Sequence, residues 1–270
     1  VNGANISKTL YLNKGGFVAV DTTTFPAYAF NATSTYNSQN ETITLQAGDM
    51  LVLTVVNTDT VQHGFSVRGM AGANFFISAL ATVTDTIGFP SAGVFIFHDH
   101  QNYPDYTYLG AAGMINVEAN APDARYFWNL HEFERSWNDS LDSGQTVNWA
   151  NFNPDYFTVN GLSYPRIDVD STAKVRGTVG DTIHICIANT GRSVHSVHFH
   201  GYHLRVVHSS KNPVEVNWSR DTQPIWPMET LLLELVPDKP GIFPVHDHNL
   251  MAQTGNRYYN HGIMLYMQIQ

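Results

Sequence analysis

The stretch that decides the fold occurs twice in the chain, as GDMLVLTVVNT at residues 48–58 and as GDTIHICIANT at residues 180–190. Each copy joins a Gly-Asp turn to a run of alternating residues, and each run ends at a polar Asn-Thr turn. Alternation of this kind, rich in β-branched side chains, is typical of a half-buried β-strand. A phrase repeated at this length indicates an internal duplication, so the sequence predicts two similar halves.

The match between the halves continues beyond this phrase. A histidine follows the asparagine of each copy by six residues, as His63 in the first half and His195 in the second. Further along, GVFIFHDH at residues 93–100 has its counterpart in GIFPVHDH at residues 241–248. The shared order and spacing strengthen the prediction of a duplicated unit.

Strand-like segments separated by Gly, Pro, Asn and Asp turns recur throughout the 270 residues, and no segment shows a long helical period. The predicted class is therefore all-β. We expect two tandem β-sandwich domains, residues 1–120 and 121–270, because the sequence ANAPD at residues 119–123 interrupts two strand patterns.

The composition argues against several classes of protein. Acidic residues outnumber basic ones by 23 to 14, and the net charge of −9 argues against nucleic-acid binding. No apolar run reaches the roughly 20 residues of a membrane span. The single cysteine, Cys186, excludes an intrachain disulfide, a cysteine zinc site and an iron–sulfur cluster built by this chain alone. Charged residues make up only 14% of the chain, which favours an extracytoplasmic β-protein.

Histidines form three His-x-His pairs, and these pairs are the strongest chemical signal in the sequence. Because alternate residues of a strand share a face, both histidines of a pair point the same way. Neutral imidazoles suit copper, zinc, iron and nickel, and the intrinsic order of affinity favours copper. We therefore predict that the pairs bind a metal; the alternative is hydrogen bonding in a polar seam between the sandwiches. The predicted ligands are His98, His100, His198, His200, His246 and His248.

The second half resembles a known family at several motifs. HSVHFHG at residues 195–201, Asp221 with Thr222, PGIF at residues 240–243 and the pair His246 and His248 resemble the terminal cupredoxin domain of multicopper oxidases. The resemblance is greatest to the ceruloplasmin and two-domain laccase branches, and it covers nearly the whole chain as two repeats. It implies two Greek-key cupredoxin domains and a copper cluster of the type 2 and type 3 kind.

The resemblance assigns the six histidines to different copper ions. It places three of them at one copper of the type 3 pair, namely His100, His200 and His246. It assigns His98 and His248 to the partner copper of that pair and His198 to the type 2 copper.

Two positions depart from the family pattern. Ser66 and Arg68 stand where the family has a further His-x-His pair, so the resemblance implies one to three copper ions per chain, and we expect two. His63 and His203 are candidates for a replacement ligand. The same two departures argue against a copper nitrite reductase.

The aspartates in the middle of the His-Asp-His triplets, Asp99 and Asp247, replace the cysteine of the type 1 copper site. No blue copper is therefore expected. We predict hydrogen-bonded pairs instead, Asp99 with His63 and Asp247 with His195, because a buried carboxylate needs a partner. The alternative for the second half is a metal site made of His195, Asp247 and His261.

The leading functional hypothesis is a laccase-like or phenol-oxidase-like copper oxidoreductase. It acts with dioxygen on a small reducing substrate that meets the histidine-bound copper directly. The alternative is a non-catalytic copper-binding or copper-sequestering protein. The resemblance also implies a homotrimer with copper sites between subunits, located in the periplasm or secreted. The sequence assigns no catalytic residue.

Overall fold

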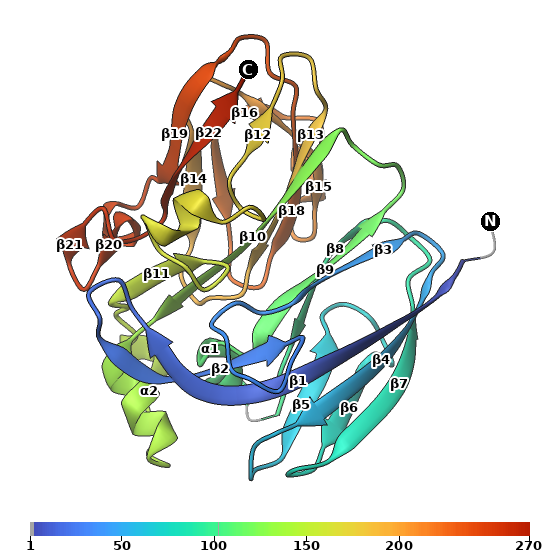
Figure 1. Cartoon of the computed structure of the whole chain (residues 1–270), viewed down its shortest axis with the longest axis vertical. Coiled ribbons are helices and arrows are strands. Elements are labelled where there is room, and N and C mark those ends of the chain that lie inside the picture. Colours follow the sequence, from blue (N-terminus) through green and yellow to red (C-terminus); the bar gives the residue numbers. More distant parts are fainter. Residues whose placement is uncertain (1–2, 102) are drawn as a thin grey trace. The chain divides into compact units, whose positions relative to one another are not determined.

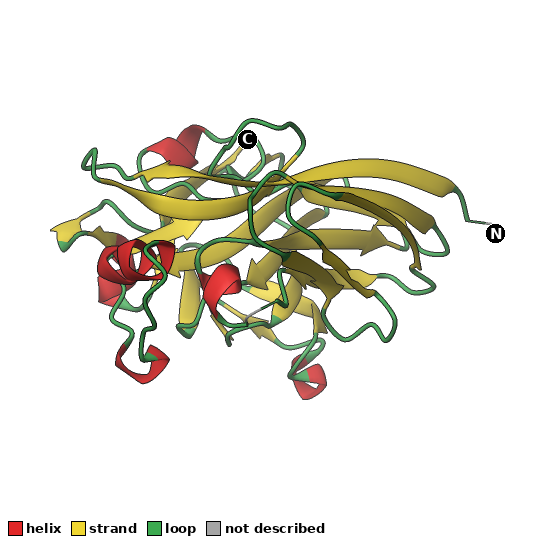
Figure 2. Cartoon of the chain, turned by 90° about the horizontal axis from the view of Figure 1, so that it is seen from below, coloured by secondary structure: helices red, strands yellow, loops and turns green. Residues whose placement is uncertain are grey.

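The computed structural model describes residues 3–101 and 103–270. Strands are the predominant secondary structure (Figure 1), and the helices are few and short (Figure 2). The predicted all-β class is confirmed. The helices of the described residues are α1 (Asp105–Tyr108), α2 (Arg135–Asp142) and the 3-10 helices Trp149–Asn151, Arg166–Val169, Pro213–Glu215 and Leu250–Gln253. None of these has the length and apolar character that a membrane crossing needs.

The chain divides into two compact units. Unit 1 contains the described residues up to 18 together with 24–120 and 136–147, and unit 2 contains 19–23, 121–135 and 148–270. A single division after residue 120, as expected from the sequence, therefore misassigns two short segments. Residues 19–23 belong to unit 2, and residues 136–147 belong to unit 1.

Hydrogen bonds to residues far away in the sequence hold both segments in their units. In unit 1, the amide of Asn138 donates to the carbonyl of Pro26 over 2.8 Å. In unit 2, the carboxylate of Asp21 accepts from the Tyr156 hydroxyl at 3.1 Å and from the Asn256 amide at 3.0 Å. Local periodicity carries no information about such partners, which explains the difference.

Unit 1 is a sandwich of two sheets. Its four-stranded sheet has the order β2-β1-β4-β7, and its five-stranded sheet has the order β3-β9-β8-β5-β6. Both sheets contribute to one apolar core, with Leu10 and Leu53 from the first and Phe65 and Ile115 from the second. The strands are β1 (Asn5–Val18), β2 (Thr24–Asn31), β3 (Thr42–Gln46), β4 (Met50–Asn57), β5 (His63–Val67), β6 (Asn74–Ile77), β7 (Thr82–Gly88), β8 (Gly93–His98) and β9 (Ala112–Glu118).

Unit 2 is built in the same way. Its larger sheet has the order β16-β15-β18-β13-β10-β11-β20-β21, and its smaller sheet has the order β12-β22-β19-β14-β17. Ile185 and Leu233 from the larger sheet pack in one core with Val197 and Leu265 from the smaller. The strands are β10 (Ala124–Phe133), β11 (Tyr156–Val159), β12 (Arg176–Gly177), β13 (Ile183–Asn189), β14 (His195–Phe199), β15 (Leu204–Ser209), β16 (Ser219–Arg220), β17 (Thr222–Ile225), β18 (Thr230–Leu235), β19 (Gly241–Asp247), β20 (Thr254–Gly255), β21 (Tyr258–Tyr259) and β22 (Met264–Ile269).

The sequence repeat is also a structural repeat. The repeated phrase forms β4 and β13, and each has a parallel neighbour on one side, β1 or β10, and an antiparallel neighbour on the other, β7 or β18. In the five-stranded sheets, β8 lies between β9 and β5, just as β19 lies between β22 and β14. The two His-Asp-His triplets therefore occupy equivalent places in their units.

Candidate metal centre

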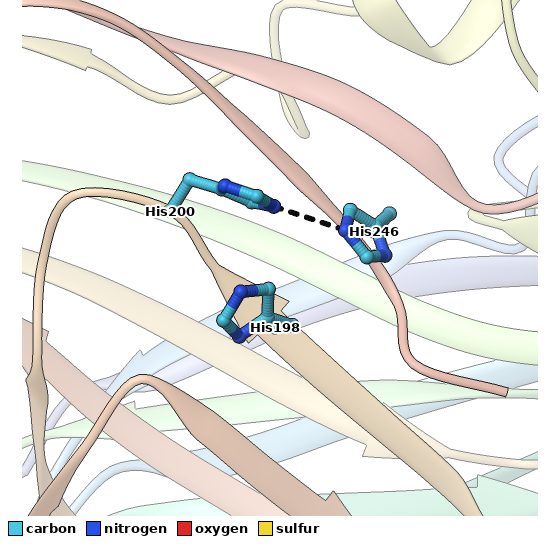
Figure 3. Close-up of side chains that lie close together, drawn as sticks. All are labelled: His198, His200 and His246. Carbon is cyan, nitrogen blue, oxygen red and sulfur yellow. Dashed lines mark hydrogen bonds between the residues drawn. The ribbon is translucent and has the colours of Figure 1, made fainter.

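Three of the predicted ligands gather in unit 2. His198 lies on β14, His200 directly follows that strand, and His246 lies on β19 (Figure 3). One nitrogen from each imidazole lies within 4.8 Å of the others. Within residues 3–101 and 103–270, this is the one group of three or more His, Cys, Asp or Glu side chains that is close enough to hold an ion.

Strand geometry explains why these side chains meet. The alternation along β14 turns Val197 and Phe199 into the core and leaves His198 on the half-buried face. His198 is paired with His246 in the antiparallel register of β14 and β19. Residues paired in this way project from the same face of a sheet, so the register brings the two imidazoles together.

Hydrogen bonds to the Nδ1 atoms orient two of the rings. His246 Nδ1 lies 3.0 Å from the carbonyl oxygen of Asp247 and 3.1 Å from Nε2 of the Gln253 amide, so this ring nitrogen is already engaged. His198 Nδ1 lies 2.8 Å from the Thr222 hydroxyl. Both rings therefore keep Nε2 for a ligand, and a partner on the other ring nitrogen is the usual arrangement around metal-binding histidines.

The spacing of the donors fits a bound ion. His200 Nε2 lies 3.0 Å from His246 Nε2. Imidazole nitrogens bind zinc at about 2.0–2.1 Å, so two ligands of one such ion are at most about 4 Å apart. A set of imidazoles without thiolate is also suitable for copper. The residues present therefore fit a copper ion at this place.

The surroundings favour the neutral form of His200. Burial, and then the neighbouring imidazoles of His198 and His246, lower the pKa of His200. Only the neutral imidazole has a lone pair for a metal. His200 is therefore ready to bind without first losing a proton near neutral pH.

A cavity of about 650 Å³ lies against His198 and His200. This volume is within the range of about 300–1,000 Å³ that is typical of small-molecule sites. Its wall also contains Tyr202, Asp221 and Lys239. His203, the sequence candidate for a replacement ligand, lines the same cavity but is not part of the three-histidine group.

His248 lies near the group without belonging to it. The centre of its ring is 5.5 Å from that of His198 and 6.3 Å from that of His246. The His248 side chain is exposed. His248 is therefore a candidate ligand only for a second ion beside His198, apart from the one that the three histidines would hold.

Unit 1 holds the other two predicted ligands. His98 is buried, and its Nδ1 lies 3.1 Å from the Thr107 hydroxyl and 3.3 Å from the carbonyl of Asp99. Burial, followed by the charges of His100 and Arg68, lowers the pKa of His98 to about 4, so its imidazole is neutral. The orientation repeats that of His246, because both rings face the carbonyl of the following aspartate.

His100 has a buried Nδ1 atom with no hydrogen-bond partner. Its ring packs against Phe76 with the ring centres 4.9 Å apart, and it fills the space in front of Gly64. The residue paired with His98 is Ser66, which stands where unit 2 has His198 opposite His246. Unit 1 by itself therefore presents two imidazoles and lacks the third.

The predicted aspartate–histidine pairs are both present, and each is part of a larger buried triad. In unit 2, His195 Nδ1 lies 2.5 Å from Asp247 Oδ2, and His195 Nε2 lies 3.2 Å from Glu132 Oε2. All three side chains are fully buried. The sequence analysis missed Glu132; the signal was a charged residue inside the apolar strand β10.

The triad of unit 1 also has a histidine between two carboxylates. His63 Nδ1 lies 2.6 Å from Asp99 Oδ2, and His63 Nε2 lies 3.2 Å from Asp59 Oδ2. The Tyr28 hydroxyl donates to the same oxygen of Asp59 over 2.8 Å. Both nitrogens of His63 are therefore engaged by carboxylates, which leaves none for the metal that the sequence analysis considered.

Charge complementarity sets the protonation of the unit 2 triad. Burial alone lowers the pKa of His195, but the hydrogen bonds and charges of Asp247 and Glu132 outweigh it and raise this pKa to about 9. Burial raises the pKa of Glu132, but the contact with His195 outweighs it and brings this pKa to about 2. At neutral pH, His195 is therefore an imidazolium that faces a carboxylate.

This arrangement differs from the alternative metal site of His195, Asp247 and His261. Glu132, rather than His261, contacts the second nitrogen of His195. In the described part of the chain these three residues do not form a close group of donor atoms, and His261 Nδ1 is buried without a partner. Asp247 and Glu132 engage both ring nitrogens of His195, which is the physical reason for the difference.

Comparison with known proteins agrees with the motifs. Residues 138–269 match the family model for multicopper oxidases. The blue copper oxidase from Nitrosomonas europaea superposes with a TM-score of 0.83 at 23% identity, over 98% of this chain and 86% of that one. The multicopper oxidase mgLAC has a TM-score of 0.82 at 20% identity, over 99% and 86%. A copper nitrite reductase from Nitrosomonas europaea has a TM-score of 0.77 at 17% identity, over 98% and 94%.

No curated protein sequence matches this chain significantly. At the identities above, the structural likeness establishes the fold, and the sequence match to the multicopper oxidase family covers residues 138–269. The one cysteine of this chain, Cys186, is buried in β13, away from both triplets in the sequence. The second half of the chain therefore matches the multicopper oxidase sequence pattern, and the whole chain shares the fold of the solved copper oxidases, with aspartate at the centre of both His-Asp-His triplets.

Proposed function

We propose that this protein is a copper-dependent oxidoreductase that oxidises a small reducing substrate with dioxygen. The grouping of His198, His200 and His246 carries the proposal, because three imidazoles so close together suit copper. Bound copper supplies one-electron transfer between the substrate and dioxygen.

The side chains around the three histidines have distinct roles in this proposal. Thr222 and the carbonyl of Asp247 orient two of the ligands through their Nδ1 atoms. The cavity beside His198 admits a small substrate to the ligands, and Asp221 in its wall is a group that can accept a proton from a substrate hydroxyl.

The proposed reaction is closer to that of a phenol oxidase than to that of a blue oxidase. Neither triplet offers the thiolate of a type 1 copper site, since Asp99 and Asp247 stand in the middle positions. A substrate in the cavity would therefore have to give its electrons directly to copper held by the histidines. The open cavity against His198 and His200 supports this route.

His98, His100 and His248 are the further proposed ligands, with two copper ions per chain. The neutral His98 and the unpartnered Nδ1 of His100 suit this role, but Ser66 deprives unit 1 of a third imidazole. We propose that a homotrimer completes the sites, with unit 1 of one subunit against unit 2 of the next. Light scattering that gives the mass of three chains of 30.1 kDa supports this assembly, and a monomer contradicts it.

A second candidate function is copper binding or sequestration outside the cytoplasm, without turnover. The triad of Glu132, His195 and Asp247 favours it, because hydrogen-bonded side chains fill the position at which related proteins hold the type 1 copper. A chain without a type 1 copper retains its other copper ligands but accepts electrons less readily from an external donor.

Oxygen consumption by the copper-loaded protein with an o-diphenol separates the two candidates. We expect uptake that the substitution His200→Ala abolishes. His208→Ala is the matched control, since His208 lies on β15 and is outside the three-histidine group. Copper bound by the three histidines without oxygen uptake favours sequestration.

A further inference from the structure

The buried triad of unit 2 lies directly behind the candidate ligands. His195 and Asp247 belong to β14 and β19, the neighbouring strands that also carry His198 and His246. His195 and Asp247 are fully buried, whereas His198 and His246 are on the half-buried face. The triad and the ligands therefore occupy opposite faces of one strand pair.

The backbone pairing between these two strands is short. Its register joins three pairs of residues: Val197 with Asp247, His198 with His246, and Phe199 with Val245. Two more backbone bonds extend it, from the His200 amide to the Pro244 carbonyl over 3.0 Å at one end and from the His248 amide to the Ser196 carbonyl over 2.7 Å at the other. Backbone pairing at the end of so short a ladder opens more readily than pairing in a sheet interior.

The side chain of Asp247 extends the ladder past this end. Its Oδ2 atom contacts His195 Nδ1 on β14 at 2.5 Å. Its Oδ1 atom accepts from the Ser196 amide of β14 at 3.2 Å and from the Asn249 amide at 2.8 Å. One carboxylate thus links β14, β19 and the turn that follows β19.

Glu132 supports the same link from the other sheet of unit 2. It lies on β10, and its Oε2 atom is 3.2 Å from His195 Nε2. Its Oε1 atom accepts from the Arg192 amide at 2.6 Å and from the Ser193 amide in the turn before β14. Both carboxyl groups and both imidazole nitrogens are therefore satisfied inside the core, as a stable buried network requires.

We propose that Glu132, His195 and Asp247 are positioning residues for the copper site. They fix β14 against β19 and so keep His200 Nε2 and His246 Nε2 at the spacing of two ligands of one ion. The inference rests on the proposed function in taking copper as that ion, but its effect on the strands is independent of any metal.

Unit 1 provides an internal control. Asp99 makes the corresponding contacts, with His63 Nδ1 at 2.6 Å and with the amides of Gly64 and Gln101, both at 2.8 Å. The residue opposite His98 is Ser66 rather than a histidine. The change from Asp to Asn can therefore be made in either triad, and only the one in unit 2 lies behind the three-histidine group.

The first test is a titration with cupric ions of the wild type, Asp247→Asn and Asp99→Asn, at a temperature at which all three remain folded. The three-histidine site is defined as the binding that His246→Ala removes. We expect Asp247→Asn to weaken this site about 10- to 100-fold and to change its paramagnetic resonance spectrum, with a smaller loss in Asp99→Asn, whose triad lies behind His98 and His100 instead. Wild-type affinity in a folded Asp247→Asn variant overturns the inference.

A pair of His195 variants covers the case in which Asp247→Asn does not fold. His195→Asn and His195→Ala both remove the imidazolium from Glu132, so both lose that contact. The asparagine amide retains a donor near the position of Nδ1 for Asp247, whereas alanine does not. We expect His195→Asn to bind copper more tightly than His195→Ala, and equal affinities contradict the inference.

Hydrogen exchange of the metal-free protein separates this inference from the proposed function. We expect Asp247→Asn to accelerate exchange of the His248 amide while the amides between β13 and β18 keep their protection. Unchanged exchange at His248 overturns the positioning role. Absence of the His246-dependent copper site from the wild type, in contrast, refutes the proposed function and leaves the exchange result standing.

Discussion

His200 Nε2 and His246 Nε2 lie 3.0 Å apart although 46 positions separate the two residues in the sequence. The pairing of β14 with β19 produces this approach, because it sets His198 opposite His246 and places His200 just beyond the strand end. The distance between donors is therefore controlled by strand register. Several consequences can be measured.

Removal of one imidazole from the group eliminates its metal binding. We expect His246→Ala to lose one copper ion per chain in equilibrium dialysis, because two nitrogens remain where three converged. His208→Ala keeps the wild-type stoichiometry, since the half-buried His208 lies on β15 and is not part of the group. Full copper content in His246→Ala contradicts the site.

Loss of the His195 side chain strongly destabilises unit 2. His195→Ala leaves the carboxyl groups of Asp247 and Glu132 buried without their partner, and breaking a buried ion pair in this way costs about 3–5 kcal/mol. Urea unfolding measures the difference in the free energy of unfolding. His184→Ala is the control, because its contact with Glu234 at 3.7 Å is partly exposed and is worth about 1 kcal/mol or less.

The stability of the protein decreases in alkaline solution because of His195. The folded-state pKa of about 9 is above the ordinary histidine value of 6.5, so the contribution is fully present below pH 6.5 and is lost as the pH rises to 9. The difference corresponds to about 3 kcal/mol at roughly 1.4 kcal/mol per unit. Urea midpoints between pH 6 and about 10 measure the decline. If the urea midpoint of His195→Asn falls equally steeply with pH, other groups cause the decline.

Glu132 makes the stability of the protein decrease in acid solution. Its folded-state pKa of about 2 is below the ordinary glutamate value of 4.5, so its contribution is present above pH 4.5 and is lost as the pH falls towards 2. Urea midpoints of the wild type and of Glu132→Gln, compared from pH 5 down to about 2, reveal this contribution. We expect a shallower acid decline in the variant, and parallel curves exclude Glu132 as the cause.

A side chain at position 64 displaces His100. The Cβ atom of Gly64→Ala would lie 2.6 Å from Cε1 and Nδ1 of the His100 ring, which Phe76 holds on another side. Overpacking of this kind costs about 1–3 kcal/mol. We expect lower thermal stability and weaker copper binding by His100. Ser66→Ala, which removes an atom from the same strand instead of adding one, leaves the His100 ring in place; equal effects of both variants argue against a steric cause.

Local patterns in the sequence were sufficient for several features. Alternation and the repeated phrase placed β4 and β13, and the rule that alternate strand residues share a face put His198 on the side opposite His195. The buried pairs of Asp99 with His63 and Asp247 with His195 followed from the need of a buried carboxylate for a partner. Each of these conclusions depends on neighbours within a strand or on the spacing of a motif.

The tertiary structure alone decided the rest. The contact of Glu132 with His195 spans 63 residues and two sheets. The assignment of residues 19–23 to unit 2 and of 136–147 to unit 1 depends on partners that are still further away in the sequence. Sequence periodicity determines which face a side chain takes, because the strand repeat is local. The packing of strands that are far apart in the chain determines which side chains from those faces meet, and so it selects His198, His200 and His246 as the three that converge.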